Sequence, residues 1–271
     1  MIVCIGSSCN ENLWPHDRPI ACTFTSPPYN NGTNYGKDLA GNKIIDDLPE
    51  REYLDLLQKT FTLAHQHTQP GGTLWINLKP DHPMRVVDVL RCASSAGWTL
   101  QTTFAWIYSA TTPEGKNFGH FRPVQGPNPH WGFEHVYLLH RAGEGLVRLH
   151  RDAPGVGVPY SDKSNLRRFN KNATTPKVDR RCRGNVWMLP YETKTGKSQE
   201  QHPCPFPVGL PEMALRLLDL PGGSLVMDPF CGTASTGVAA CRTGLDFVGI
   251  EMSVTTVMVA RERLMQSEEK G

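Results

Sequence analysis

The chain has 271 residues, of which 39% are hydrophobic and 20% charged, and its formal net charge at pH 7 is +2. This composition excludes an intrinsically disordered chain, and no apolar run approaches the ~18 residues that a membrane-spanning helix needs. The N-terminus Met1–Ile5 lacks the basic lead and long apolar stretch of a signal peptide, so we expect a cytoplasmic location and no membrane association.

Strand and helix patterns alternate along the first 140 residues. Short β-type apolar runs predict strands at 1–5, 20–25, 73–77, 100–108 and 135–140. Apolar residues at helical spacing predict one helix from Pro49 that ends at Gly71-Gly72, and another over 86–96. The stretch 30–47 is rich in glycine and asparagine, and we expect a loop there.

Residues 141–200 differ from the rest because they are polar, basic and without sustained periodicity. They contain 13 Lys+Arg against 6 Asp+Glu. A basic block in a nearly neutral chain is typical of a surface that binds a polyanion, although a solvated charged loop has the same composition. The arginines that we expect to contact such a polyanion are Arg167, Arg168, Arg180, Arg181 and Arg183.

Regular patterns return in the last 70 residues. Helices are predicted at 211–220 and 236–243 and at the C-terminal end, with strands at 224–227 and 247–250. Strands that alternate with helices predict an α/β fold, a mostly parallel Rossmann-like sheet flanked by helices that binds ligands at the carboxyl ends of its strands.

The turn after strand 224–227 has features of a nucleotide-binding site. Gly232 lets the backbone approach a ligand, and Glu251, at the end of the next strand, can accept hydrogen bonds from ribose hydroxyls. A methyltransferase, an NAD-binding protein or a structural turn fits this pattern. Since the turn has a single glycine and no basic residue, a cofactor without phosphate is favoured.

A second turn, Ser26-Pro27-Pro28-Tyr29, follows the strand 20–25. The two prolines stiffen the turn and remove two N–H donors, which leaves carbonyl groups as acceptors. An exocyclic amine is a poor nucleophile until hydrogen bonds from its protons draw the nitrogen toward a tetrahedral form. Ser26 Oγ and the Pro27 carbonyl can accept those protons, while Tyr29 can stack on a flipped base. A rigid surface turn is the alternative.

Together the two turns resemble those of the amino-methylating DNA methyltransferases, in the permuted order of their beta class. Ser26-Pro27-Pro28-Tyr29 is similar to the catalytic tetrapeptide and Asp228-Pro229-Phe230-Cys231-Gly232-Thr233 to the cofactor loop of that family. The resemblance implies a cofactor site for S-adenosylmethionine formed by Asp228, Pro229, Phe230, Gly232, Thr233, Glu251, Phe206 and Ser7. Ser7 stands where the family often has an aspartate. Asn185-Val186-Trp187 and Glu134-His135-Val136 also match family segments.

The resemblance also implies a division of the chain and a substrate. Residues 1–140 would form the catalytic part, 141–200 the target-recognition region and 201–271 the cofactor-binding part of one domain. The substrate would be double-stranded DNA with a flipped base, as in a restriction-modification system. Serine at the first tetrapeptide position resembles the cytosine-N4 enzymes, whereas the adenine-N6 enzymes typically have aspartate there.

Two further functions are compatible with the sequence: a catalytically silent DNA-binding protein of the same fold, and an RNA amine methyltransferase.

The histidines and eight cysteines show no metal-ligand spacing, so we expect no metal, and we expect a monomer or a weak homodimer. Among the tryptophans, Trp75, Trp98 and Trp106 are predicted to be core residues, and Trp131 to face DNA.

Overall fold

The structure is a computed structural model. It describes residues 1–79, 83–111, 117–119, 132–150, 158–159, 180–181, 184–190 and 206–269. None of the helices in these ranges combines the length and the apolar character needed to cross a membrane.

The centre of the protein is an eight-stranded sheet in the order β1-β14-β13-β2-β5-β9-β6-β12. In that order its strands are Ile2–Ile5, Asp246–Glu251, Leu225–Asp228, Ile20–Thr25, Thr68–Leu78, Phe133–Arg141, Trp98–Ile107 and Val186–Met188. All pairs are parallel except those of β9, which runs antiparallel to β5 and β6. This mostly parallel sheet confirms the predicted fold class.

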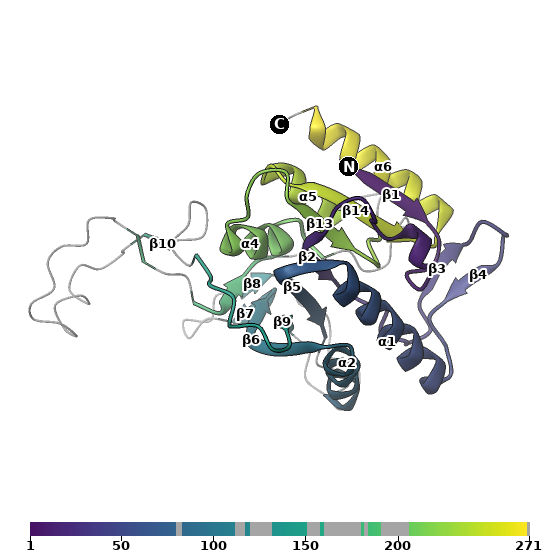
Figure 1. Ribbon diagram of the computed structural model, residues 1–271, viewed down its shortest axis with the longest axis horizontal. Helices are drawn as coiled ribbons and strands as arrows, with labels where there is room; N and C mark the ends of the chain where they lie inside the picture. The colour runs from purple at the N-terminus through teal and green to yellow at the C-terminus, as the bar shows by residue number, and fades with distance from the viewer. Residues whose placement is uncertain are drawn as a thin grey trace, which may run out of the picture.

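Within the described ranges, five α-helices cover the two faces of the sheet (Figure 1). Helices α4 (Gly209–Leu218), α5 (Ser235–Arg242) and α6 (Val254–Glu268) pack on one face, whereas α1 (Glu50–His67) and α2 (Pro83–Ser95) pack on the other. A short 3-10 helix, η1 (Glu11–Leu13), follows β1. The central strand β2 is buried along its whole length because both of its faces are covered.

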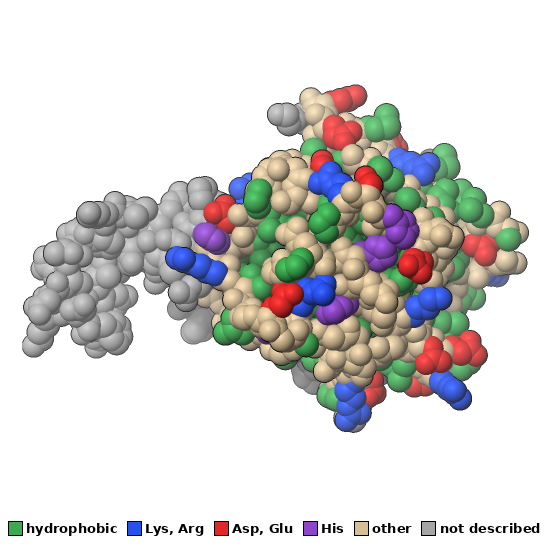
Figure 2. Space-filling view, in the orientation of Figure 1, with side chains coloured by type: hydrophobic (Ala, Val, Ile, Leu, Met, Phe, Trp, Pro, Cys, Tyr) green, Lys and Arg blue, Asp and Glu red, His purple; other side chains and the backbone are tan. Residues whose placement is uncertain are grey.

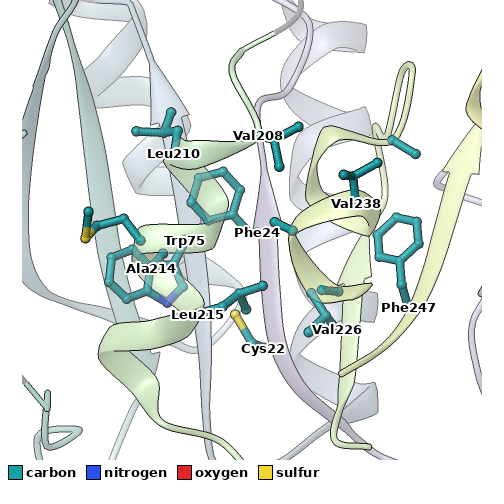
Figure 3. Packing of buried hydrophobic residues seen from close by; sticks show 14 of the residues in the cluster. Cys22, Phe24, Trp75, Val208, Leu210, Ala214, Leu215, Val226, Val238 and Phe247 are labelled. Carbon is teal, nitrogen blue, oxygen red and sulfur yellow. The ribbon is translucent and has the colours of Figure 1, made fainter. Parts of the chain in front are cut away.

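The core is built of large aromatic side chains between the sheet and the helices. Phe24 of β2 and Trp75 of β5 lie beside Leu210, Ala214 and Leu215 of α4 (Figure 3). Trp75, Trp98 and Trp106 are all buried, which confirms their prediction as core residues.

Three elements differ from the prediction. The stretch 30–47, predicted as a loop, contains the antiparallel hairpin β3 (Asn34–Lys37) and β4 (Lys43–Ile45). Helix α1 ends at His67, not at Gly71-Gly72, and strand β5 begins at Thr68. Thr68 has extended backbone angles, and its hydroxyl donates to the Ala64 carbonyl at 2.6 Å, so the helix stops before the glycines.

The basic range 141–200 also contributes to the sheet. Its strand β12 pairs with β6, and Trp187 on that strand is completely buried against Phe104, with ring centroids 4.5 Å apart. Leu149 packs on the core at the other end of the range. Two small strand pairs complete the described elements: β7 (Ser109–Thr111) with β8 (Asn117–Gly119), and β10 (Val158–Pro159) with β11 (Arg180–Arg181).

Candidate active site

The two predicted turns meet at the carboxyl edge of the sheet because β2 and β13 are neighbouring parallel strands. Thr25 ends β2 directly before Ser26, and Asp228 ends β13 directly before the glycine turn. The Thr25 hydroxyl donates a hydrogen bond to Asp228 Oδ1 at 2.8 Å. A direct contact between the last residues of the two strands therefore joins motifs that are distant in the sequence.

Asp228 is fully buried, and both of its carboxylate oxygens have protein partners. Oδ1 also accepts from the Phe230 backbone N–H at 3.1 Å, and Oδ2 accepts from the Thr236 hydroxyl at 2.8 Å. Burial raises the pKa of Asp228 from 3.8 to about 6, and the hydrogen bonds from Thr236 and Thr25 oppose this rise. The Asp228 carboxylate therefore links the start of the turn 228–233 to Phe230 within it and to Thr236 in α5.

Glu251, at the end of β14, reaches the same turn from the other side. Its Oε2 accepts from the Gly232 N–H at 3.1 Å, and its Oε1 accepts from the Ser253 N–H at 2.8 Å. Burial raises the pKa of Glu251 above its ordinary value. Gly232 has a φ of +49°, a conformation that glycine adopts without strain.

Three other residues predicted to bind a cofactor are Ser7, Phe206 and Thr233. Ser7 follows β1, and the neighbouring Gly6 N–H donates to the Glu251 carbonyl at 2.9 Å. Phe206 packs edge-to-face on Phe24, with a centroid separation of 5.7 Å. Thr233 is buried, and its hydroxyl accepts from Arg263 at 2.7 Å. These residues therefore lie on or beside the neighbouring strands β1, β14, β13 and β2.

This arrangement fits S-adenosylmethionine better than a dinucleotide. Glu251 places a carboxylate beside the turn, glycine at 232 carries no side chain there, and residues 228–236 include no Lys or Arg to neutralise a phosphate. Pro229 is buried under the turn, whereas Phe230 is half-buried beside it.

On the other side of Thr25, the tetrapeptide is organised around Tyr29. Ser26 Oγ lies 3.2 Å from Tyr29 Oη, and Tyr29 Oη donates to Glu134 Oε2 at 3.5 Å. Glu134 is only 6% exposed. It reaches this edge of the sheet because β9 runs in the reverse direction and begins there.

The contact with Glu134 sets the direction of these hydrogen bonds. Tyr29 Oη has a single proton and donates it to Glu134, so Tyr29 Oη can only accept in its contact with Ser26. The Ser26 hydroxyl then donates to Tyr29, which leaves the lone pairs of Ser26 Oγ able to accept a hydrogen bond from another donor.

Side chains of helices α1 and α2 donate hydrogen bonds to the backbone carbonyls of residues 28–30. Tyr53 Oη donates to the Pro28 carbonyl at 2.8 Å, and Arg85 donates to the carbonyls of Tyr29 and Asn30. Pro27 is buried. Sequence patterns singled out none of Tyr53, Arg85, Thr25 and Thr236 as a site residue, because their contacts with the two turns depend on how separate elements pack.

The predicted DNA contacts fall largely outside the described residues. Arg167, Arg168, Arg183 and Trp131 lie there, and for Arg180 and Arg181 the structure describes only the backbone of β11. On the face in Figure 2, acidic, basic and histidine side chains are interspersed. The described residues on this face therefore form no continuous basic surface.

Comparisons with known proteins agree with this geometry. A family model for N6/N4 methyltransferases, described as DNA methylase, matches residues 20–262. The DNA adenine methyltransferase YhdJ of Escherichia coli strain K12 is 24% identical over 243 residues, which cover 89% of this chain and 74% of that protein. The Type II methyltransferase M.SmaI of Serratia marcescens is also 24% identical, with coverage of 90% and 84%.

Solved structures share the fold. The PvuII DNA methyltransferase (cytosine-N4-specific) matches with a TM-score of 0.61 and 16% identity, over 99% of this chain and 91% of that chain. TTHA0409 of Thermus thermophilus, in complex with S-adenosyl-L-methionine, matches with a TM-score of 0.57 and 21% identity, over 98% and 93%.

Proposed function

Since the chain belongs to the N6/N4 DNA methylase family, whose model matches residues 20–262, we propose that it methylates the exocyclic N4 amine of cytosine in double-stranded DNA. At the coarser level the protein is a DNA amino-methyltransferase. Its cofactor is S-adenosylmethionine, with which the structural neighbours TTHA0409 and M1.HpyAVI were solved. When bound, this cofactor supplies an electrophilic methyl group on a sulfonium.

The residues around Ser26 carry the proposal. Because Tyr29 donates to Glu134, Ser26 Oγ can accept a hydrogen bond from one N–H of a base amine, and the Pro27 carbonyl is the proposed acceptor for the other N–H. Loss of conjugation with the ring turns the nitrogen lone pair toward the methyl group, and direct transfer needs no covalent bond to the enzyme. As the N–C bond forms, the S–C bond of the sulfonium breaks, and the amine then releases one proton to solvent. The target base would be flipped from the duplex and would stack on the half-buried Tyr29 ring.

The cofactor end is proposed to work through Gly232, Glu251, Ser7 and Phe206, with Glu251 accepting from the ribose. Pro229, Phe230 and Thr233 would shape the turn around the ligand. Asp228 is completely buried, so we propose that it supports the cofactor site by holding the turn and makes no direct contact with the cofactor.

The basic stretch 141–200 is proposed to recognise the target sequence. Phosphate or guanine contacts would come from Arg167, Arg168, Arg180, Arg181 and Arg183. Substitution of a phosphate-binding arginine should weaken binding to all duplexes and reduce its salt dependence, whereas a base contact should matter for one sequence only.

Adenine N6 is the competing target, and the relation to the E. coli adenine methyltransferase YhdJ favours it. The observation in favour of cytosine is Ser26, because serine in the first tetrapeptide position resembles the cytosine-N4 enzymes. Both amines have two protons to donate, so the shape of the base pocket decides between them.

The test is methylation of duplex DNA with S-adenosylmethionine, followed by nucleoside analysis. N4-methylcytosine is the expected product, and its loss in Ser26→Ala with cofactor binding retained would support the role of Ser26. N6-methyladenine without N4-methylcytosine would overturn the choice of base. Cofactor binding without any methylated nucleoside on a library of duplexes would point to a catalytically silent DNA-binding protein.

A further inference from the structure

Three consecutive backbone carbonyls at the end of the catalytic tetrapeptide are held by two side chains from α1 and α2. Tyr53 Oη donates to the Pro28 carbonyl at 2.8 Å. One guanidinium nitrogen of Arg85 donates to the Tyr29 carbonyl and to the Asn30 carbonyl, the latter at 2.8 Å. We call Tyr53 and Arg85 the carbonyl clamp.

The two clamp residues are also bound to each other and to the start of α1. The Arg85 guanidinium lies over the Tyr53 ring, 5.4 Å from its centroid, where the cation and the ring attract. The second terminal nitrogen of Arg85 pairs with Glu50 Oε2 at 3.2 Å. Arg85 is therefore fixed on three sides: by the loop carbonyls, by the Tyr53 ring and by Glu50.

The loop needs such support because its own backbone offers few donors. Pro27 and Pro28 have no N–H, so this segment cannot be held by a regular backbone ladder. Asn30 adds strain, with a φ of +51°, and is anchored by paired hydrogen bonds between its side chain and the backbone of Leu48 at 2.7 and 2.8 Å. Between β2 and Leu48, the carbonyl clamp holds the part of the loop that contains the catalytic residues.

We propose that Arg85 and Tyr53 are positioning residues for methyl transfer, acting by fixing the backbone at Pro28–Asn30 so that Ser26 and Tyr29 meet the target amine in the reactive geometry. This inference rests on the proposed function. Neither residue needs to touch the base or the cofactor. A displacement of about 1 Å at reacting atoms can lower a rate by about 100-fold, so a clamp several residues away has a large effect on catalysis.

The chemistry of the clamp is specific to arginine. A planar guanidinium can donate to two carbonyls and a carboxylate while it lies flat on an aromatic ring. The ammonium group of lysine keeps the positive charge but cannot make this set of contacts at once. Arg85→Lys therefore removes the set of hydrogen bonds to the loop carbonyls and Glu50 and retains the positive charge.

The experiment compares Arg85→Lys and Tyr53→Phe with the control Arg91→Lys. Arg91 is on the same helix, is largely exposed and pairs only with Asp88 among the contacts that the structure gives it. Three quantities are measured on folded protein of verified melting temperature: the single-turnover rate on duplex DNA, the cofactor Kd, and hydrogen exchange of the amides at positions 29–31.

For Arg85→Lys we expect a fall of about 100-fold in the single-turnover rate, a cofactor Kd within about 2-fold of the wild-type value, and faster exchange at positions 29–31. Tyr53→Phe, which loses a single oxygen, should show the same pattern at smaller size, and Arg91→Lys should resemble the wild type. Faster exchange with an unchanged rate, or an unchanged rate and exchange, would overturn the proposal.

The exchange measurement separates this inference from the proposed function. If the wild-type protein methylates no DNA, the proposed function fails, and exchange at positions 29–31 still reports whether the clamp holds the loop. If the wild type is active while both clamp variants match Arg91→Lys, the clamp fails and the proposed function stands.

Discussion

Thr25 and Asp228 lie 203 positions apart in the sequence, yet the hydroxyl of the first donates to the carboxylate of the second at 2.8 Å. One residue immediately precedes the catalytic tetrapeptide, and the other begins the cofactor turn. In the proposed function, this contact fixes the catalytic tetrapeptide relative to the turn that would hold the cofactor.

Replacement of Thr25 by valine should test this contact with little change of shape. The variant leaves a buried carboxylate with one fewer donor, so we expect a loss of about 1–3 kcal/mol in the free energy of unfolding and slower methyl transfer. Urea denaturation and single-turnover assays measure the two effects.

The same strand offers a matched control in Thr23. Its hydroxyl is buried and has no hydrogen-bond partner among the described residues, so Thr23→Val should be neutral or stabilising. Equal destabilisation by both substitutions would show that the strand rejects valine generally and that the Thr25–Asp228 hydrogen bond has no special part.

Asp228 should make the stability of the protein depend on pH. Because burial raises its pKa from 3.8 to about 6, the folded protein binds this proton more tightly than the unfolded chain. The resulting stabilisation is complete below the unfolded value and is lost as pH rises through about 6. Asp228→Asn cannot ionise, so its stability relative to the wild type should increase over this range, by at most about 3 kcal/mol.

Urea denaturation of both proteins between about pH 4 and pH 7.5 measures this difference. The pKa of Glu251 is also raised by burial, but that residue is present in both proteins, and its contribution largely cancels in the comparison. Parallel pH profiles for the two proteins would contradict the raised pKa of Asp228.

Glu134 should act on catalysis through Tyr29. Glu134→Gln replaces the carboxyl group that accepts from the Tyr29 hydroxyl, and Tyr29→Phe removes the hydroxyl itself, so each should slow methyl transfer by about 10-fold, as expected for the loss of a buried hydrogen bond. Since both act on one chain of hydrogen bonds, the double variant should be little slower than Tyr29→Phe alone.

A double-mutant cycle of single-turnover rates checks this coupling. Glu144→Gln is the control, because Glu144 pairs with Arg141 at 3.1 Å and binds the Gly71 N–H near the other end of β5. Additive losses for Glu134 and Tyr29 would show that the two side chains act independently.

We expect Glu251 to affect the Kd for S-adenosylmethionine and not the rate of methyl transfer from the bound cofactor. Glu251→Gln keeps the shape but replaces one acceptor oxygen by a donor, so the Kd for S-adenosylmethionine should rise by about 10-fold or more. Calorimetry measures the change, with Glu262→Gln on the exposed side of α6 as the control. A Kd equal to that of the control would remove Glu251 from the cofactor site.

Local patterns in the sequence were sufficient to predict much of the fold. The apolar run Ile20–Thr25 became β2, and the run before Asp228 became β13, because a strand covered on both faces must be apolar throughout. Their order and the turns that follow them predicted a mostly parallel sheet and placed both motifs at its carboxyl edge. The family match bears out the DNA methyltransferase that these motifs predicted.

Elements whose stability comes from distant contacts were harder to predict. Strand β12 lies in a polar stretch, and it joins the sheet because Trp187 fills a space beside Phe104 and Trp75. The hairpin β3–β4 has no apolar alternation, and its glycine-rich sequence is typical of a loop. For the end of α1, the glycines were a misleading signal, since Thr68 leaves the helix first.

The sequence by itself determined which residues follow the strands, and therefore which side chains lie at the carboxyl edge of the sheet. Those features depend on neighbours along the chain. Only the tertiary structure decided how Thr25 meets Asp228, how Glu134 orients Tyr29, and how Arg85 and Tyr53 hold the loop. Each of these contacts joins side chains from separate elements, and their hydrogen bonds depend on ångström-scale distances that strand order and sheet packing set.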